Sequence, residues 1–270
     1  MYTLKVALEE ATATIGRVDA QVLITHSLGV DRAYLVANPL RVLTETEDAR
    51  IDMLVAQRAM GFPVAYLTGT REFYSRPFAV SEEVLIPRPE TETLVEAALQ
   101  APFGSALDLG TGSGVVAITL ALERPQSRVT AVDRSEGALA IARANAKALQ
   151  ASVELLAGDW YAPVAGRRFD LIVSNPPYVA ADDPHLAEGD LRHEPQHALT
   201  DGSADGLDSI RAIVKGAREH LNPGGRLLFE HGYDQARAVA ALLRDAGFAS
   251  PVSIPDLAGI PRVAGGTLPA

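Results

Sequence analysis

The chain has 270 residues, 47% of them hydrophobic, no cysteine and a net charge of −10. The length allows a sizeable core and two domains, and the missing cysteines exclude disulfides, thiolate metal sites and a cysteine nucleophile. The acidic charge disfavours a nucleic-acid substrate, because duplex binding depends on lysine and arginine that neutralise phosphates.

Residues 1–73 are predicted to form a small helical bundle, because apolar residues recur there at helical spacing. Asp31 is expected to cap a short helix over 32–37, and Thr44 is expected to open a longer helix over 45–61 with a capping box. Helices this short depend on mutual packing. The bundle contains no catalytic cluster, so it serves either as a scaffold or in the recognition of a macromolecule.

A connector and a second domain are expected to follow the bundle. Residues 64–88 read as extended pieces joined by a turn, which indicates a hairpin, and 74–88 are assigned to the connector. Arg88 stands between two prolines and is therefore held in an extended segment, followed by a helix over 93–99. This rigid segment either lies over a ligand or acts as a stiff linker. The second domain is predicted to span 89–270.

Strands and helices alternate through this second domain. Strands are expected at 105–109, 128–132, 153–156, 169–174, 225–230 and 248–254. Helices are expected at 115–122, 135–149, 206–221 and 233–246. This rhythm predicts an α/β fold, a mostly parallel sheet with helices on both faces. The stretch 179–205 interrupts it; its histidines and carboxylates match no metal motif, so a mobile loop on the substrate side is expected, with no metal.

A glycine-rich loop follows the first of these strands. The segment carries Asp108, Gly110, Thr111, Gly112 and Gly114. Glycine lets the backbone turn sharply and lets a ligand approach without a Cβ in the way. The G-x-G-x-G spacing differs from the G-x-G-x-x-G of dinucleotide folds, and the acidic residue repels phosphates but attracts a cationic amino group. An NAD site and a glycine turn without a ligand are the alternatives.

Two further strands also end in acidic residues. Asp133 stands nineteen residues after Gly114, where a carboxylate can accept both hydroxyls of a ribose. Asp159 can accept the exocyclic amine of adenine and Trp160 can stack on its ring; the alternative is a core tryptophan beside a turn aspartate. A ligand with a ribose, a cationic end and no phosphate describes S-adenosylmethionine, which becomes S-adenosylhomocysteine after methyl transfer.

The tetrapeptide Asn175-Pro176-Pro177-Tyr178 follows the apolar run 171–174 and therefore stands at the carboxyl end of a buried strand. Its two prolines cannot donate backbone hydrogen bonds and hold the turn stiff. The turn presents carbonyl groups, an amide side chain and an aromatic ring. These groups suit a flat substrate with an NH2, whose hydrogens the carbonyls accept while the ring stacks on its face. The alternative is a proline-rich loop that only ends the strand.

These motifs together resemble the release factor glutamine methyltransferases, and the resemblance covers most of the chain. The most specific segments are 86–92 and 175–178, although the latter alone also occurs in adenine-N6 DNA methyltransferases. His231, after Glu230, stands where an apolar residue is expected. The shared motifs lie at 66–69, 72–74, 86–92, 108–114, 158–159, 175–178, 194–195, 205–208, 221–225 and 256–259.

The resemblance implies an N-terminal helical bundle, a β-hairpin connector and a Rossmann-like, seven-stranded class I methyltransferase domain. It implies methyl transfer from S-adenosylmethionine to the side-chain N5 of the glutamine in the Gly-Gly-Gln motif of class I peptide release factors. The cofactor roles that it carries over fall on Gly110–Gly114, Asp133 and Asp159-Trp160, with Asp108 and Asn175 beside them. The catalytic and substrate roles fall on Asn175, Pro176 and Tyr178, with Pro177 in the same turn.

Other functions remain open at this point. The same chemistry could act on a glutamine of a ribosomal protein, and the tetrapeptide also admits adenine methylation in DNA. An NAD-dependent oxidoreductase is disfavoured by the glycine spacing, and a non-catalytic translation-factor binder is disfavoured by the intact loop and Asn175. The lack of a signal peptide and of an apolar run of ~18 residues predicts a cytoplasmic protein without a membrane span, and a monomer is expected.

Overall fold

The computed structural model describes residues 2–270, which divide into two compact units. The helical unit comprises the chain up to Thr70 together with Glu188–His193, and the sheet unit comprises Arg71–Ala187 and Glu194–Ala270. Among the described residues, no helix combines the length and the apolarity needed to cross a bilayer. The sequence placed the first boundary at residue 73 and assigned all of 179–205 to the second domain, so the observed division differs at both points.

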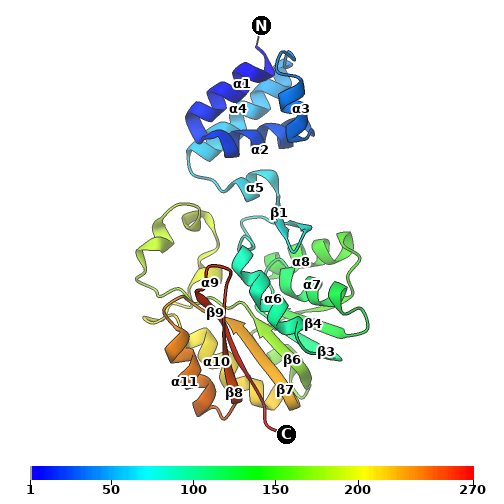
Figure 1. The fold of residues 1–270 in the computed structure, drawn as a ribbon, viewed down its shortest axis with the longest axis vertical. Helices are drawn as coiled ribbons and strands as arrows, with labels where there is room; N and C mark the ends of the chain where they lie inside the picture. Colours follow the sequence, from blue (N-terminus) through cyan, green and yellow to red (C-terminus); the bar gives the residue numbers. More distant parts are fainter. Residues whose placement is uncertain (1) are drawn as a thin grey trace. The chain divides into compact units, whose positions relative to one another are not determined.

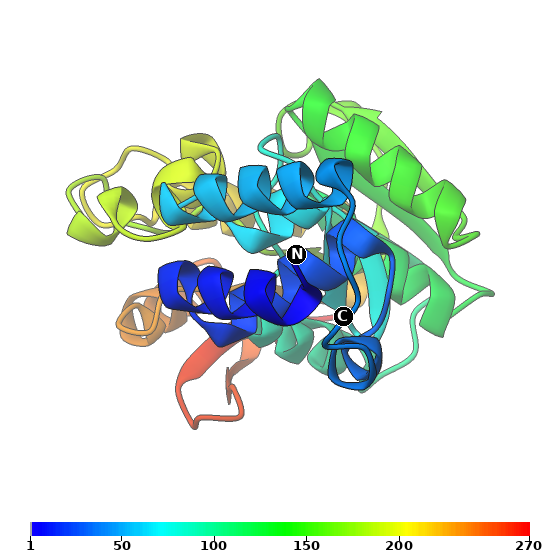
Figure 2. The same ribbon diagram turned by 90° about the horizontal axis from the view of Figure 1, so that it is seen from above.

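The described residues of the helical unit form five α-helices, drawn in blue to cyan in Figures 1 and 2. They are α1 (Leu4–Ile15), α2 (Arg17–Leu28), α3 (Arg32–Ala37), α4 (Glu45–Ala59) and α5 (Val64–Thr68). Asp31 caps α3, and the predicted capping box of Thr44 and Glu47 opens α4. The prediction of extended structure at 64–68 is wrong: a short helix begins after Pro63 at its N-cap, and Gly69 in the left-handed conformation ends it.

A piece of the long loop belongs to the helical unit. Arg58 of α4 donates to Asp19 (2.7 Å) and to Asp190 (2.8 Å). The rings of Phe62 and His193 stack with centroids 4.5 Å apart. These contacts join residues that are far apart in sequence, so local composition could not reveal them.

A two-stranded hairpin opens the sheet unit, formed by β1 (Thr70–Phe73) and β2 (Arg76–Ala79). Tyr74 and Ser75 form its turn with φ of 50° and 58°, the conformation of a two-residue type I′ loop. The hairpin therefore begins earlier than the predicted connector at 74–88. Phe73 and Phe78 on its strands are buried in the core of the sheet unit.

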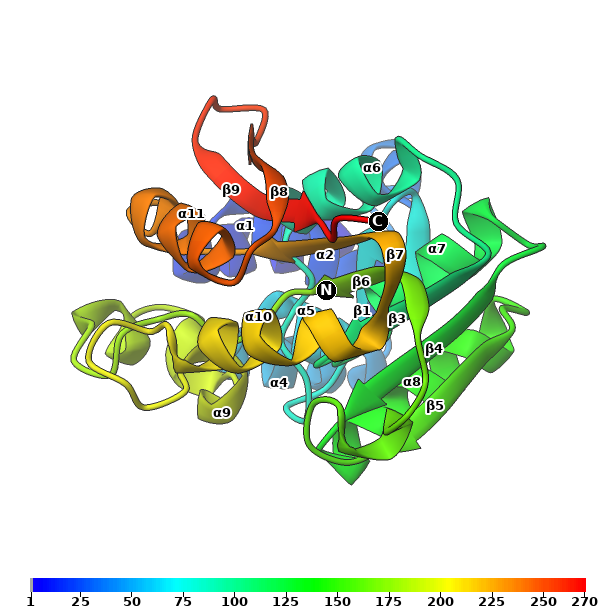
Figure 3. The same ribbon diagram turned by 90° about the horizontal axis from the view of Figure 1, so that it is seen from below.

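The central sheet has seven strands in the order β5-β4-β3-β6-β7-β9-β8 (Figure 3). Its strands are β3 (Ser105–Leu109), β4 (Arg128–Asp133), β5 (Val153–Ala157), β6 (Phe169–Ser174), β7 (Leu221–Glu230), β8 (Ala249–Pro255) and β9 (Pro261–Thr267). The pairs from β5 to β7 are parallel, and β9 runs antiparallel to both of its neighbours. The strand β9 was not predicted, because Gly265 and Gly266 weaken its strand propensity and obscure the strand pattern.

Helices cover both faces of this sheet and enclose two cores. The helices α6 (Glu92–Leu99), α7 (Val115–Glu123) and α8 (Glu136–Ala148) pack into one core with Leu171 and Val173. The helices α10 (Asp208–His220) and α11 (Ala236–Asp245) pack into the other, with Phe169 and Ile172. Leu171, Ile172 and Val173 thus face alternate layers, as in a fully buried central strand, whereas the register irregularity before Leu171 places Phe169 outside this alternation. Short helical turns occupy Pro89–Thr91, Ala162–Val164, Pro184–Ala187, Leu191–His193 and α9 (Gln196–Leu199).

The strand order changes direction between β3 and β6, and the predicted functional motifs lie at this position. Leu109 of β3 pairs with Val132 of β4 on one side and with Ser174 of β6 on the other. The residues that follow these three strand ends therefore emerge side by side. Ligands of open α/β sheets bind at such a switch point, beyond the carboxyl ends of the strands.

A buried asparagine of α8 holds the hairpin against the glycine loop. Asn145 accepts from the Ala79 N–H (2.7 Å) and donates to the Ala79 carbonyl (3.0 Å) and to the Ser113 carbonyl (2.9 Å). Its side chain therefore satisfies backbone groups of two segments that form no regular ladder with each other, which is necessary because unpaired buried backbone groups are costly.

Replacing this side chain should destabilise the sheet unit. Asn145→Ala leaves buried backbone groups of Ala79 and Ser113 without partners, and we expect the free energy of unfolding to fall by about 3 kcal/mol. Urea denaturation measures this loss. The matched control is Lys147→Ala on the exposed face of the same helix, and equal effects of the two substitutions would contradict the clamping role of Asn145.

Candidate active site

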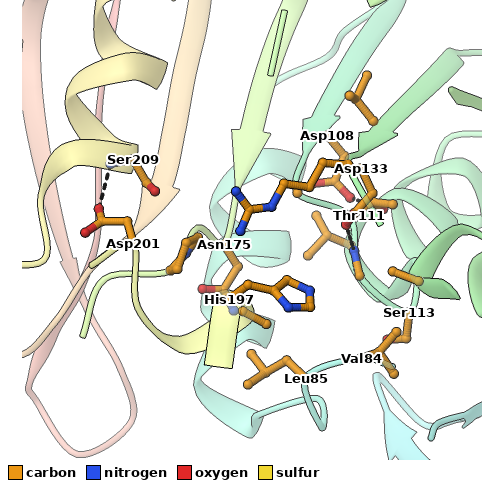
Figure 4. A pocket seen from close by; sticks show the side chains of 18 of the residues that line it. Val84, Leu85, Asp108, Thr111, Ser113, Asp133, Asn175, His197, Asp201 and Ser209 are labelled. Carbon is orange, nitrogen blue, oxygen red and sulfur yellow. Dashed lines mark hydrogen bonds between the residues drawn. The ribbon is translucent and has the colours of Figure 1, made fainter. Parts of the chain in front are cut away.

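A cavity of about 580 Å³ lies at the switch point (Figure 4). All of its lining residues belong to the sheet unit. They come from the segment before α6, from the glycine loop, from the ends of β4, β5 and β6, and from the loop that leads to α10. The lining includes Val84, Leu85, Arg88, Thr91, Asp108, Gly110, Thr111, Gly112, Asp133, Asp159, Trp160, Asn175, Pro177, His197, Asp201 and Ser209.

The glycine loop forms one wall of the cavity. Gly110, Gly112 and Gly114 have backbone φ angles of 70°, 55° and 84°, which residues other than glycine rarely adopt. The N–H groups of Gly110 and Thr111 donate to the Val132 carbonyl (2.9 and 3.1 Å) and tie the loop to β4. A Cβ on Gly112 would meet nothing within 4 Å, so the backbone at this position is open to a ligand.

Asp133 links the loop to the next strand. Its Oδ2 accepts from the Gly112 N–H (2.8 Å) and its Oδ1 from the Ser135 N–H (2.9 Å). A carboxylate oxygen has two lone pairs, so each oxygen keeps acceptor capacity toward the cavity that Asp133 lines. The side chain can thus shape the loop and accept the hydroxyls of a ligand together.

Asp108 is buried at the floor of the cavity, with 1% of its surface exposed. Burial raises the pKa of this carboxyl to about 7, and the nearby charge of Asp133 adds to the rise; hydrogen bonds from the Thr111 hydroxyl (2.6 Å) and the Ala117 N–H oppose it. Within residues 2–270 neither Asp108 nor Asp133 forms an ion pair, so a positively charged group in the cavity would be favoured.

The third acidic strand end reaches the same cavity. Gly158, Asp159 and Trp160 line it. Trp160 adopts a positive φ of 43°, and a Cβ built on Gly110 would lie 3.7 Å from its ring. The structure thus brings the three acidic strand ends of the sequence analysis together with the only tryptophan.

The Asn-Pro-Pro-Tyr turn divides between cavity and core. Asn175 and Pro177 line the cavity, and Figure 4 shows Asn175 at the end of its strand. Pro176 is buried, and neither it nor Tyr178 lines the cavity. The Tyr178 side chain packs against the core to which α10 and α11 contribute, and its hydroxyl donates to Glu230 Oε1 (2.9 Å). The structure therefore ties the tyrosine to a buried carboxylate.

Several lining residues carry no sequence signal that assigns them a role. His197, Asp201 and Ser209 come from the loop after 179 and from the start of α10, and Asp201 accepts from the Ser209 N–H (2.7 Å). Thr91 lines the cavity and donates to Glu230 (2.7 Å). The motifs at 86–92, 194–195 and 205–208 marked these neighbourhoods through the resemblance alone.

A buried glutamate fastens the segment before α6. Glu194 is 3% exposed and accepts from the Ile86 N–H (2.9 Å) and from the Arg88 guanidinium. A carboxylate that leaves water needs a cation and hydrogen-bond donors to compensate. Arg88 lines the cavity and is held there by this pairing, so the segment is more than a linker between domains.

Family models identify the class of protein. The model described as the PrmC N-terminal domain matches residues 4–69, and the methyltransferase small domain matches residues 89–204. Two solved structures share the fold. A methyltransferase from Pyrococcus furiosus has a TM-score of 0.57 at 17% identity over 80% of this chain and 98% of its own. The T. Thermophilus 16S rRNA N2 G1207 methyltransferase, solved with AdoMet and guanosine, has a TM-score of 0.53 at 20% identity over 74% and 49%. The chain has the fold of a class I methyltransferase.

Relatives of higher identity define the family within this class. The release factor glutamine methyltransferase of Burkholderia pseudomallei is 52% identical over 93% of this chain and 92% of its own length. The protein of the same name from Bordetella pertussis is 51% identical over 93% and 95%. The chain belongs to the release factor glutamine methyltransferase family, which confirms the resemblance found in the sequence.

Removal of the buried glutamate should loosen this site. Glu194→Ala leaves the Ile86 N–H and the Arg88 guanidinium without their acceptor, and we expect the free energy of unfolding to fall by about 2–3 kcal/mol. Chemical denaturation measures the loss, with the exposed helical substitution Glu219→Ala as control. A loss no greater than that of the control would show that the pairing contributes nothing to stability.

Proposed function

We propose that this protein transfers a methyl group from S-adenosylmethionine to the side-chain amide nitrogen of the glutamine in the Gly-Gly-Gln motif of class I peptide release factors. The observation that carries the proposal is the meeting of the glycine loop and the Asn175 side chain in one cavity. The names of the relatives support the protein substrate. The proposed enzyme acts in the cytoplasm as a monomer. Its substrate is a protein rather than a nucleic acid, in keeping with the net charge of −10.

The cavity residues fit S-adenosylmethionine. The open backbone at Gly112 leaves room for the ligand, and the remaining lone pairs of Asp133 suit ribose hydroxyls. Asp159 and Trp160 suit the amine and the ring of adenine. Asp108 suits the amino group, because a cation relieves the cost of two neighbouring carboxyl groups. When bound, the cofactor supplies a methyl group on a positively charged sulfur.

The turn after β6 prepares the glutamine amide for transfer. An amide nitrogen is a weak nucleophile, since its lone pair is delocalised into the carbonyl. The Asn175 Oδ1 and the Pro176 carbonyl accept its two hydrogens, orient the nitrogen and stabilise the positive charge that builds on it. One hydrogen then leaves the nitrogen as a proton to solvent after transfer. Tyr178 supports the turn through Glu230, and Pro177 contributes apolar surface to the cavity.

The direct test is methylation of purified substrate. The enzyme is incubated with S-adenosylmethionine and a class I release factor, and the tryptic peptide that carries the Gly-Gly-Gln motif is analysed by mass spectrometry. One added methyl group on that glutamine supports the proposal. Label that appears instead in ribosomal protein or in DNA would overturn it in favour of the corresponding alternative substrate.

Loss of the substrate acceptor should slow turnover and spare cofactor binding. We expect Asn175→Ala to lower kcat about 10²–10³-fold, by analogy with the loss of one preorganised group that stabilises a transition state. The dissociation constant of S-adenosylhomocysteine, measured by calorimetry, should stay within about twofold of the wild-type value. Tight cofactor binding lost in this variant would contradict the assignment of Asn175 to the substrate.

Cofactor affinity should depend on pH through Asp108. Its pKa near 7 means that the carboxyl gains a proton as pH falls through 7, while the ligand amino group stays protonated. The carboxylate is the form that attracts this cation, so the affinity for S-adenosylhomocysteine should fall from pH 7 to pH 5.5, by up to about tenfold per unit. Calorimetry across this range measures the slope. Asp108→Asn should remove most of it, and an unchanged slope would assign the titration to another group.

A further inference from the structure

The proposed mechanism requires the Asn175 amide to face in one direction. The oxygen and the nitrogen of this side chain have nearly the same shape. Only the orientation with Oδ1 toward the substrate can accept a hydrogen from the glutamine amide, whereas the reversed orientation presents two donors to another donor. Packing cannot distinguish the two orientations, so a hydrogen-bond partner of fixed polarity is needed.

The structure supplies such a partner through a chain of three buried or half-buried groups. The Asn175 Nδ2 donates to the Thr91 Oγ1 (3.1 Å), and the Thr91 hydroxyl donates to the Glu230 Oε2 (2.7 Å). Glu230 ends β7, and Thr91 ends the helical turn before α6. Thr91 is 84 positions from Asn175 and 139 positions from Glu230 in the sequence, so only the fold brings the three residues together.

Glu230 determines the direction of donation in this series of hydrogen bonds. It is 1% exposed, and its other oxygen accepts from the Tyr178 hydroxyl (2.9 Å). A carboxylate can only accept, so Thr91 must give its single hydrogen to Glu230 and has only lone pairs left for Asn175. Burial raises the pKa of Glu230 and the charge of Glu90 adds to the rise, while the two hydroxyl bonds and the charge of Arg262 oppose it. Each of its two oxygens accepts from one hydroxyl group, Thr91 on one side and Tyr178 on the other.

We infer that Thr91 and Glu230 are positioning residues that hold the Asn175 amide with its oxygen toward the substrate. The inference rests on the proposed function. It also explains the buried carboxylate, whose desolvation is costly without partners: the same group aligns Asn175 through Thr91 and fastens Tyr178 at the other end of the turn. Neither residue needs to touch the reacting atoms.

The test compares substitutions that change polarity while they preserve shape. Thr91→Val removes the hydroxyl, and we expect kcat for release-factor methylation to fall about tenfold, the equivalent of one oriented hydrogen bond. Thr91→Ser retains the hydroxyl and should recover kcat to within about threefold of wild type. Glu230→Gln can place its NH2 against Thr91 and reverse the chain, so a fall in kcat at least as large is expected.

Controls separate positioning from general damage. Thr119→Val makes the same change at a threonine that is 0% exposed and whose Oγ1 has no hydrogen-bond partner in the described part of the chain, so kcat should not change. The affinity for S-adenosylhomocysteine, measured without any turnover, should be unchanged in all variants. In an Asn175→Ala background, Thr91→Val should alter kcat by less than about twofold, because both changes act on one group.

The outcomes decide between the two levels of the proposal. Wild-type enzyme that leaves the release factor unmethylated overturns the proposed function and this inference with it. Wild-type methylation with a Thr91→Val variant that behaves like Thr119→Val overturns the inference alone. Thr91→Val that weakens S-adenosylhomocysteine binding as strongly as it lowers kcat also overturns it, since Thr91 would then serve the cofactor. If Glu230→Gln fails to fold, the Thr91 series decides.

Discussion

The pairing of β3 with β6 is the constraint on which the site depends. Parallel strands end at the same edge of a sheet, and the strand order changes direction at this pair. No helix covers the edge at such a point, so the residues after each strand are free to form a cavity. The pairing of Leu109 with Ser174 places the glycine loop beside Asn175 at a distance that no sequence spacing could set. A register shift of one residue would turn the final side chains to the opposite faces.

Loops around this edge are held in place by buried polar side chains. Asn145 and Glu230 each bind two segments that share no backbone ladder, and Glu194 ties the segment before α6 to its own loop. A buried amide or carboxylate is costly unless its lone pairs and hydrogens find partners. This cost makes the arrangement specific: a displaced loop would leave the polar group unpaired, whereas an apolar contact tolerates sliding. The site therefore gains its order from groups whose removal leaves buried partners unpaired.

The charge at the cavity is unfavourable for folding and suits the cationic ligand that we propose. In the described part of the chain Asp108 lies near Asp133 and neither forms an ion pair, and burial is the main cause of the raised pKa of Asp108. This unfavourable interaction is relieved when a positive ligand enters, so part of the cost of folding returns as affinity. The helical unit shows the opposite arrangement, since Arg58 there is paired with both Asp19 and Asp190. Unpaired charge thus coincides with the cavity that our proposal assigns to a cationic ligand.

The sequence alone determined the parts of this protein whose physics is local. The strand at 105–109, the glycine loop, the capping box at Thr44 and the stiff Asn-Pro-Pro-Tyr turn follow from short-range hydrophobic pattern, backbone freedom and proline geometry. The strand β9 was missed because two glycines weaken its pattern, and the helix at 64–68 was missed because it is only five residues long. Only the tertiary structure decided that Thr91, Glu230 and Asn175 form one chain of hydrogen bonds and that Tyr178 turns toward Glu230. These contacts join residues from distant elements. The direction of each hydrogen bond is fixed only because the fold excludes water and leaves these donors no other acceptor.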